Sequence, residues 1–163
     1  MISRRRLLKT SSLALFPTFA PKLSVAKSAN GKLSHACIGT DGMGWGDLES
    51  LSSHPNIQIT AICDVDTARM EKAAAKFPQA RRYQDWRELL EKEGDKIDSV
   101  NVTVPDHMHA PITMRALRAG KNVYCQKPPT HHVSEARDLR LAADQAKVVT
   151  QMGNQIQSAI EYL

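Results

Sequence analysis

The sequence predicts an α/β fold, a doubly wound parallel sheet of about six strands with helices on both faces. From residue 33 onward, short apolar runs alternate with stretches of helical periodicity. The apolar runs are too continuous for strands that expose one face to water, which indicates a parallel sheet covered on both sides. The connections between the segments are short, as in compact α/β units.

The first half of this pattern contains three strands, each followed by a helix. We expect strands at 33–39, 57–66 and 81–85, and helices at 44–54, 66–77 and 85–94. Leu48 and Leu51 lie three residues apart and give the first helix an apolar face. Asp66 or Thr67 can cap the second helix, and Gly94 ends the third.

The second half repeats the alternation. We expect strands at 97–105, 122–128 and 148–154, and helices at 109–121 and 134–147. Pro105 ends its strand, and Pro111 lies in the first turn of the next helix, which has Gly120 at its C-cap. Ser134 is expected to cap the last of these helices. Residues 155–163 begin an amphipathic helix in which the sequence stops without a capping residue, so we expect a truncated connecting helix.

The basic charge of the chain lies at its N-terminus. The formal net charge is +5, but residues 1–32 hold seven Lys or Arg and no Asp or Glu. The remaining residues contain more acidic than basic side chains. Because a folded basic face is missing, we expect no nucleic-acid partner.

Residues 1–29 have the pattern of an export signal. The run SRRRLLK at residues 3–9 resembles a Tat-type signal, with Leu7 where Phe is usual. Ser-Val-Ala at residues 24–26 forms a small-x-small cleavage site. We therefore expect an exported, periplasmic protein; an unstructured basic tail is the alternative. The apolar run is broken by Pro17 and Pro21 and is too short for a membrane anchor.

The three cysteines, Cys37, Cys63 and Cys125, each lie in or at the end of an apolar run. No pair has the spacing of metal ligands or of a redox motif. An odd number is also a poor disulfide framework. We therefore expect buried free thiols and no metal.

Residues 39–44, GTDGMG, follow the first strand and open the first helix, as in a dinucleotide-binding turn. In such a turn the first glycine makes a tight bend, and the third lets the helix pack on the strand. Gly39 holds the first place here and Gly44 the third. Asp41 holds the second place, where a carboxylate adds bulk and repels phosphate, although Gly42 or Gly46 can restore some freedom. The helix N-terminus favours an anion. A purely structural turn is the alternative. The cofactor residues expected here are Gly39, Thr40, Asp41, Gly42, Met43 and Gly44.

Asp64 ends the second strand, 20 residues beyond Gly44. A carboxylate at this spacing accepts hydrogen bonds from the adenosine ribose and repels a 2′-phosphate, which favours NAD over NADP. Capping of the next helix is the alternative role, for which Asp66 competes.

Two further motifs follow the fourth and fifth strands, at the edge where open α/β sheets bind ligands. His107 and His109 alternate like metal ligands but have no third ligand nearby, so we expect them to cap the helix or line a cofactor cleft. Lys127 is followed by proline and can hydrogen-bond a substrate hydroxyl and assist its proton transfer. An ordinary surface lysine is the alternative.

Together, GTDGMGWGDL, AICDVD, TVPDHMHAPITMRALRAGKNVYCQKP and QMGNQ resemble, in order and spacing, the glucose–fructose oxidoreductase, inositol dehydrogenase and MocA family over residues 32–163. The resemblance implies a Rossmann domain at 32–154 that binds NAD, with NADP possible, and hydride transfer to or from a sugar or polyol. Lys127 matches the catalytic lysine of the family. The resemblance assigns cofactor positions to Gly39, Gly44, Asp64, Thr103, Pro105, His109, Gln126, Lys127 and Asn154.

The sequence departs from the family pattern at several points. Asp41 replaces a glycine, Gln126 replaces the glutamate of the Glu-Lys-Pro motif, and Pro129 replaces a leucine. The resemblance also implies a second α/β domain, which in the family supplies the substrate pocket, an Asp/His pair and most of the dimer contact, and we expect this domain to be missing. We therefore expect a nucleotide-binding domain that is inactive alone and that oligomerises only if a C-terminal domain is supplied. A non-catalytic partner domain and a nonfunctional remnant are the alternatives.

Overall fold

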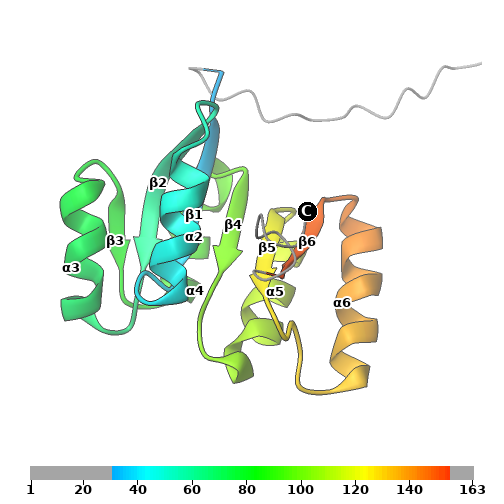
Figure 1. Ribbon diagram of the computed structural model, residues 1–163. Coiled ribbons are helices and arrows are strands. Elements are labelled where there is room, and N and C mark those ends of the chain that lie inside the picture. Colours follow the sequence, from blue (N-terminus) through cyan, green and yellow to red (C-terminus); the bar gives the residue numbers. More distant parts are fainter. Residues whose placement is uncertain (1–30, 155–163) are drawn as a thin grey trace, which may run out of the picture.

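The computed structural model describes residues 31–154, which form a six-stranded sheet flanked by helices (Figure 1). The expected export signal and the helix expected at 155–163 lie outside these residues. The elements are β1 (Leu33–Ile38), α2 (Met43–Ser52), β2 (Ile57–Cys63), α3 (Thr67–Lys76), β3 (Arg81–Tyr83), α4 (Trp86–Glu93), β4 (Ser99–Val102), α5 (His109–Arg118), β5 (Asn122–Gln126), α6 (Val133–Ala146) and β6 (Thr150–Gly153), with 3₁₀ turns at Gly94–Lys96 and Asp106–Met108.

The strand order is β3-β2-β1-β4-β5-β6, and every pairing is parallel. From β1 at the centre, the next two strands, β2 and β3, are added on one side. β4 then pairs with the other side of β1, and β5 and β6 follow outward from β4. This reversal between β1 and β4 is the switch point at which open sheets of this kind bind ligands. The predicted doubly wound parallel sheet is confirmed.

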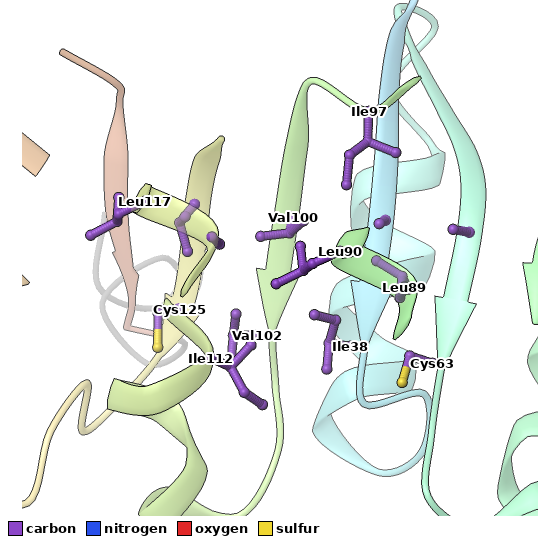
Figure 2. Packing of buried hydrophobic residues seen from close by; sticks show 14 residues of the cluster. Ile38, Cys63, Leu89, Leu90, Ile97, Val100, Val102, Ile112, Leu117 and Cys125 are labelled. Atoms are coloured by element: carbon purple, nitrogen blue, oxygen red, sulfur yellow. The ribbon is translucent and has the colours of Figure 1, made fainter. Parts of the chain in front are cut away.

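Helices cover both faces because successive residues of each strand point to opposite sides. On one face, Ala36 and Ile38 of β1 join a cluster with buried residues of α4 and α5, and partly buried residues of α6 pack against it. Figure 2 shows the buried part of this cluster, with Ile38 near Leu89 of α4 and Ile112 of α5 labelled. On the other face, Cys37 packs with Leu48 of α2 and with residues of α3. The central strands are therefore buried on both sides, as their apolar sequences predicted.

The local stop and start signals agree with the structure except at the ends of β4 and α5 and at the start of α6. β4 ends at Val102, three residues before Pro105, and the C-cap of α5 is Ala119, followed by Gly120 at a φ of 70°, a conformation that favours glycine. Asp66 caps α3, its carboxylate accepting the N–H groups of Ala68 and Arg69, and Gly94 ends α4. The predicted cap at Ser134 is wrong, because α6 begins one residue earlier with His132 as its N-cap. The carboxylate of Glu135 accepts the backbone N–H groups of residues 131 and 132, each at 3.0 Å, and this anchors the helix start before Ser134.

The predicted free thiols are confirmed, since Cys37, Cys63 and Cys125 are all buried and unpaired within β1, β2 and β5. Burial raises the pKa of all three thiols, that of Cys63 to about 12. None of the helices that the structure describes is long and apolar enough to cross a membrane.

Candidate functional site

A cleft of about 1080 Å³ runs along the carboxyl ends of the strands. Figure 1 shows these strand ends at the lower edge of the sheet. The cleft crosses the switch point from β2, past β1 and β4, to β5. Of the predicted site residues, those that line it are Gly39, Thr40, Asp41, Met43, Gly44, Asp64, Thr103, Pro105, His109, Gln126 and Lys127. Gly42 and Asn154 are not among the lining residues; Asn154 is exposed after β6.

The glycine turn is held by backbone packing that leaves no room for side chains. Gly39 has a φ of 92°, and a Cβ built there would lie 1.9 Å from the carbonyl oxygen of Thr103. A Cβ on Gly44 would lie 2.4 Å from the carbonyl oxygen of Gly39. The first and third glycines of the motif are therefore sterically required, and they bring the start of α2 against the ends of β1 and β4.

Asp41 keeps its place in the turn and directs its carboxylate toward α3. Its carbonyl accepts the backbone N–H of Gly44 at 2.9 Å. Its carboxylate lies 3.7 Å from Nη1 of Arg69, and both side chains are largely exposed. The tight turn thus forms without glycine at the second place.

Asp64 is bound to the glycine turn at the β2 end of the cleft. One of its carboxylate oxygens accepts the backbone N–H of Thr40 at 2.9 Å and its hydroxyl at 3.1 Å. The other accepts the N–H of Asp66 at 3.1 Å. Since Asp66 supplies the cap of α3, the capping role considered for Asp64 does not apply.

Asp47 of α2 is a functional candidate that the sequence reasoning missed. Its carboxylate accepts the Thr103 hydroxyl at 2.7 Å and the Gln126 amide at 3.0 Å, which joins α2 to the ends of β4 and β5. The side-chain amide of Asn101 in turn donates to the Thr103 hydroxyl at 3.1 Å. The signal available was its spacing, because Asp47 lies three residues after Gly44 and so shares the helix face that packs on the strands.

Lys127 follows β5 directly and is exposed to the cleft. Its backbone N–H donates to the side-chain oxygen of Gln126 at 3.4 Å, so the contact of Gln126 with Asp47 also fixes the start of this loop. The next peptide bond, to Pro128, is cis.

His109 holds the loop after Lys127 in place through a hydrogen bond to its backbone. It is buried at the start of α5, and its Nδ1 lies 2.6 Å from the carbonyl oxygen of Pro128. Because a carbonyl only accepts, Nδ1 carries the proton in this contact. The other ring nitrogen is buried without a hydrogen-bond partner among the described residues. His107 is exposed, and within residues 31–154 no group of three or more His, Cys, Asp or Glu is placed to hold a metal ion.

Comparison with known proteins identifies the kind of domain. Residues 33–154 match the family model GFO_IDH_MocA, described as an oxidoreductase family with an NAD-binding Rossmann fold. The chain is 30% identical over 109 residues to inositol 2-dehydrogenase of Rubrobacter xylanophilus, covering 66% of this chain and 30% of the relative. It is 31% identical over 156 residues to a glycosyl hydrolase family 109 protein of Solibacter usitatus, covering 84% and 35%.

The structure is similar to that of GenD2 from gentamicin A biosynthesis in complex with NAD. The TM-score is 0.73 with 29% sequence identity, and the match covers 79% of this chain and 36% of GenD2. The chain therefore spans about a third of the length of the relatives it matches.

Proposed function

We propose that this chain, which belongs to the Gfo/Idh/MocA family of oxidoreductases, binds NAD in the cleft at the carboxyl edge of its sheet. The observation that carries the proposal is the direct contact between the glycine turn and Asp64. It brings together, in one cleft, a helix N-terminus suited to the pyrophosphate and a carboxylate suited to the ribose hydroxyls.

The residues present fit the cofactor. Gly39 and Gly44 allow the tight turn that brings the start of α2 to the cleft, and Asp41, at the place where the pyrophosphate approaches, has its carboxylate directed toward Arg69. Asp64 lies beyond β2, at the place of the adenosine ribose. Lys127 lies at the opposite end of the cleft, beyond β5; in this proposal the nicotinamide half would lie there.

Titration with NADH tests the binding proposal. Trp86 lines the cleft, so we expect saturable quenching of tryptophan emission as NADH fills it. Asp64→Ala should weaken NADH binding by about tenfold or more, because it removes a charged hydrogen-bond acceptor. Asp106→Asn is the matched control, an exposed acid of the same cleft that lies away from β2. Absence of saturable binding by the natural chain would contradict the proposal.

We further propose that the parent reaction is hydride transfer between nicotinamide and a hydroxyl-bearing carbon of a sugar or polyol. The name of the inositol 2-dehydrogenase relative supports this substrate class. The bound cofactor would accept or supply the hydride. Lys127 would donate a hydrogen bond to the substrate hydroxyl and assist removal of its proton.

Cofactor reduction tests the activity separately from binding. A panel of polyols, with myo-inositol first, is incubated with the chain and NAD while NADH absorbance is followed. Reduction that disappears in Lys127→Met would support the proposal. Reduction that persists at the natural rate in this variant would contradict the role of Lys127, and no reduction with any polyol would agree with the expectation that the chain is inactive alone.

We also propose that residues 1–29 direct export to the periplasm, on the strength of the adjacent Arg4 and Arg5 in the Tat-like run. A reporter fused to the chain should reach the periplasm. Replacing both arginines with lysine should keep it in the cytoplasm, since that change keeps the charge but alters the motif. Equal export of the two fusions would contradict the proposal.

A further inference from the structure

The geometry points to Asp41 and Arg69 as a pair that selects NAD over NADP. We propose that Asp41 neutralises Arg69, the cation placed to receive a 2′-phosphate, and so excludes NADP. The inference rests on the proposed binding of NAD in this cleft.

Arg69 lies on α3 and lines the cleft at its β2 end. Its guanidinium contacts carboxylates from two different elements. Nη1 lies 3.7 Å from Asp41 in the glycine turn, and Nε lies 3.3 Å from Asp66 at the start of α3. The guanidinium thus bridges the gap between the turn and α3, in the cleft that Asp64 also lines.

The position of this bridge relates it to the ribose. Asp64 is the acceptor for the adenosine ribose hydroxyls, and a 2′-phosphate is an ester of one of these hydroxyls. A phosphate there would face Asp64 and the guanidinium of Arg69. Of the other Lys and Arg side chains that line the cleft, Lys127 lies at the far end, beyond β5, and Arg87 lies on α4, after β3. Arg69 is the cation that connects the glycine turn with the start of α3, and it is the cation to which the 2′-phosphate is assigned.

The local charge explains why this cation does not attract the phosphate. Three carboxylates, those of Asp41, Asp64 and Asp66, surround this end of the cleft, against the single charge of Arg69. The net charge of these four side chains is negative, and it repels a doubly charged phosphate. The carboxylate of Asp66 caps α3, and that of Asp64 accepts the backbone N–H of Thr40 in the glycine turn. Arg69 is paired with both Asp41 and Asp66, and Asp41 is the partner whose loss would leave the cap of α3 and the contacts of Asp64 in place.

Because Asp41 and Arg69 are both largely exposed, their pairing contributes little to folding, and a substitution at either position should change selectivity without unfolding the protein. This permits a double-mutant cycle. The affinities of the natural chain for NADH and NADPH are compared with those of Asp41→Asn, Arg69→Met and the double variant, all at low ionic strength. Asp106→Asn, another exposed acid of the cleft, controls for a general change in charge.

We expect Asp41→Asn to raise the affinity for NADPH relative to NADH by roughly three- to tenfold. In the Arg69→Met background the same substitution should change this ratio little, and Asp106→Asn should leave it unchanged. Added salt should reduce the effect, since screening weakens exposed charges.

Other outcomes overturn the inference in identifiable ways. An unchanged ratio in Asp41→Asn, with NADH still bound, refutes the role of Asp41. A rise that persists in full in Arg69→Met refutes the role of Arg69. If the natural chain binds neither nucleotide, the proposed function fails first and this inference falls with it.

Discussion

At the scale of single residues, Asp47 connects the cleft to the helix beneath it. Its carboxylate receives hydrogen bonds from Thr103 and Gln126, which end two adjacent strands. Gln126 is buried, and its amide has little access to water as a substitute partner. Removing the acceptor would therefore leave a buried donor without compensation, which costs more than the loss of an exposed hydrogen bond.

We expect Asp47→Ala to lower the free energy of unfolding by about 1–3 kcal/mol, because Gln126 and Thr103 lose their shared acceptor. Glu49→Ala is the matched control on the same helix, since Glu49 pairs with Lys76 at the exposed surface. Urea denaturation of both variants gives the comparison. Equal stability of the two would show that the Asp47 contacts contribute nothing beyond a surface pair.

His35 supplies a pH-dependent contribution to stability. It is buried in β1, where its ring nitrogens lie 2.7 Å from the Ser99 hydroxyl and 3.2 Å from the side-chain oxygen of Asn101. Burial lowers the pKa of His35 from 6.5 to about 4, although the hydrogen bond with Asn101 opposes this shift. Between these values the unfolded chain binds a proton that the folded chain does not, so stability falls as the pH falls.

The lowered pKa of His35 predicts a loss of about 3 kcal/mol in the free energy of unfolding. The loss begins as the pH falls below 6.5 and is complete near pH 4. His35→Gln should remove this part of the pH dependence, because glutamine does not titrate. His54→Gln, at an exposed histidine after α2, should leave it intact. Urea denaturation across this pH range makes the measurement, and identical pH profiles for the natural chain and His35→Gln would contradict the assignment.

At the scale of elements, two glycines of α2 differ in the space that they leave for a side chain. Gly44 faces the carbonyl group of Gly39, where a Cβ has no room, whereas a Cβ on Gly46 would meet nothing within 4 Å. Both lie in the same helix, so their intrinsic helical preferences are similar. A difference between them isolates the packing of helix on turn.

We expect Gly44→Ala to destabilise the protein by about 1–3 kcal/mol and to weaken NADH binding, because the start of α2 must shift away from the turn. Gly46→Ala should stabilise it by about 0.5–1 kcal/mol, since alanine favours the helix. Thermal denaturation with and without NADH measures both effects. Equal tolerance of the two substitutions would contradict the close contact at Gly44.

The same elements show what the sequence could predict. Gly39, Gly44 and the burial of the first strand on both faces, at Ala36 and Cys37, follow from local pattern, and the sheet follows from the repetition of strand and helix. The contacts of Asp47 could not be predicted in this way, because its partners lie 56 and 79 residues away. Only the strand order brings them together. The start of α6 was missed for a local reason, since Glu135 accepts the backbone N–H groups of His131 and His132 and so fixes the helix start ahead of Ser134.

At the scale of the whole molecule, burial declines from the centre of the sheet toward β6. Residues 100–102 of β4 are buried, whereas α6 has no buried residue and β6 only Gly153. Within residues 31–154, β6 pairs with β5 alone, while β4 lies between two strands. Elements with few buried contacts open locally at lower free energy than the core.

Hydrogen exchange should follow this gradient. We expect the amides of β1 and β4 to exchange most slowly, and those of β6 and α6 to open at a free energy lower by at least about 2 kcal/mol. Added NADH should slow exchange in residues 39–44, which border the cleft, while α6 serves as the internal control because it lies outside the cleft lining. Protection of β6 equal to that of β4 would contradict the gradient. NADH-dependent protection confined to α6 would place the nucleotide away from the glycine turn, since a ligand slows exchange most in the elements whose opening its binding prevents.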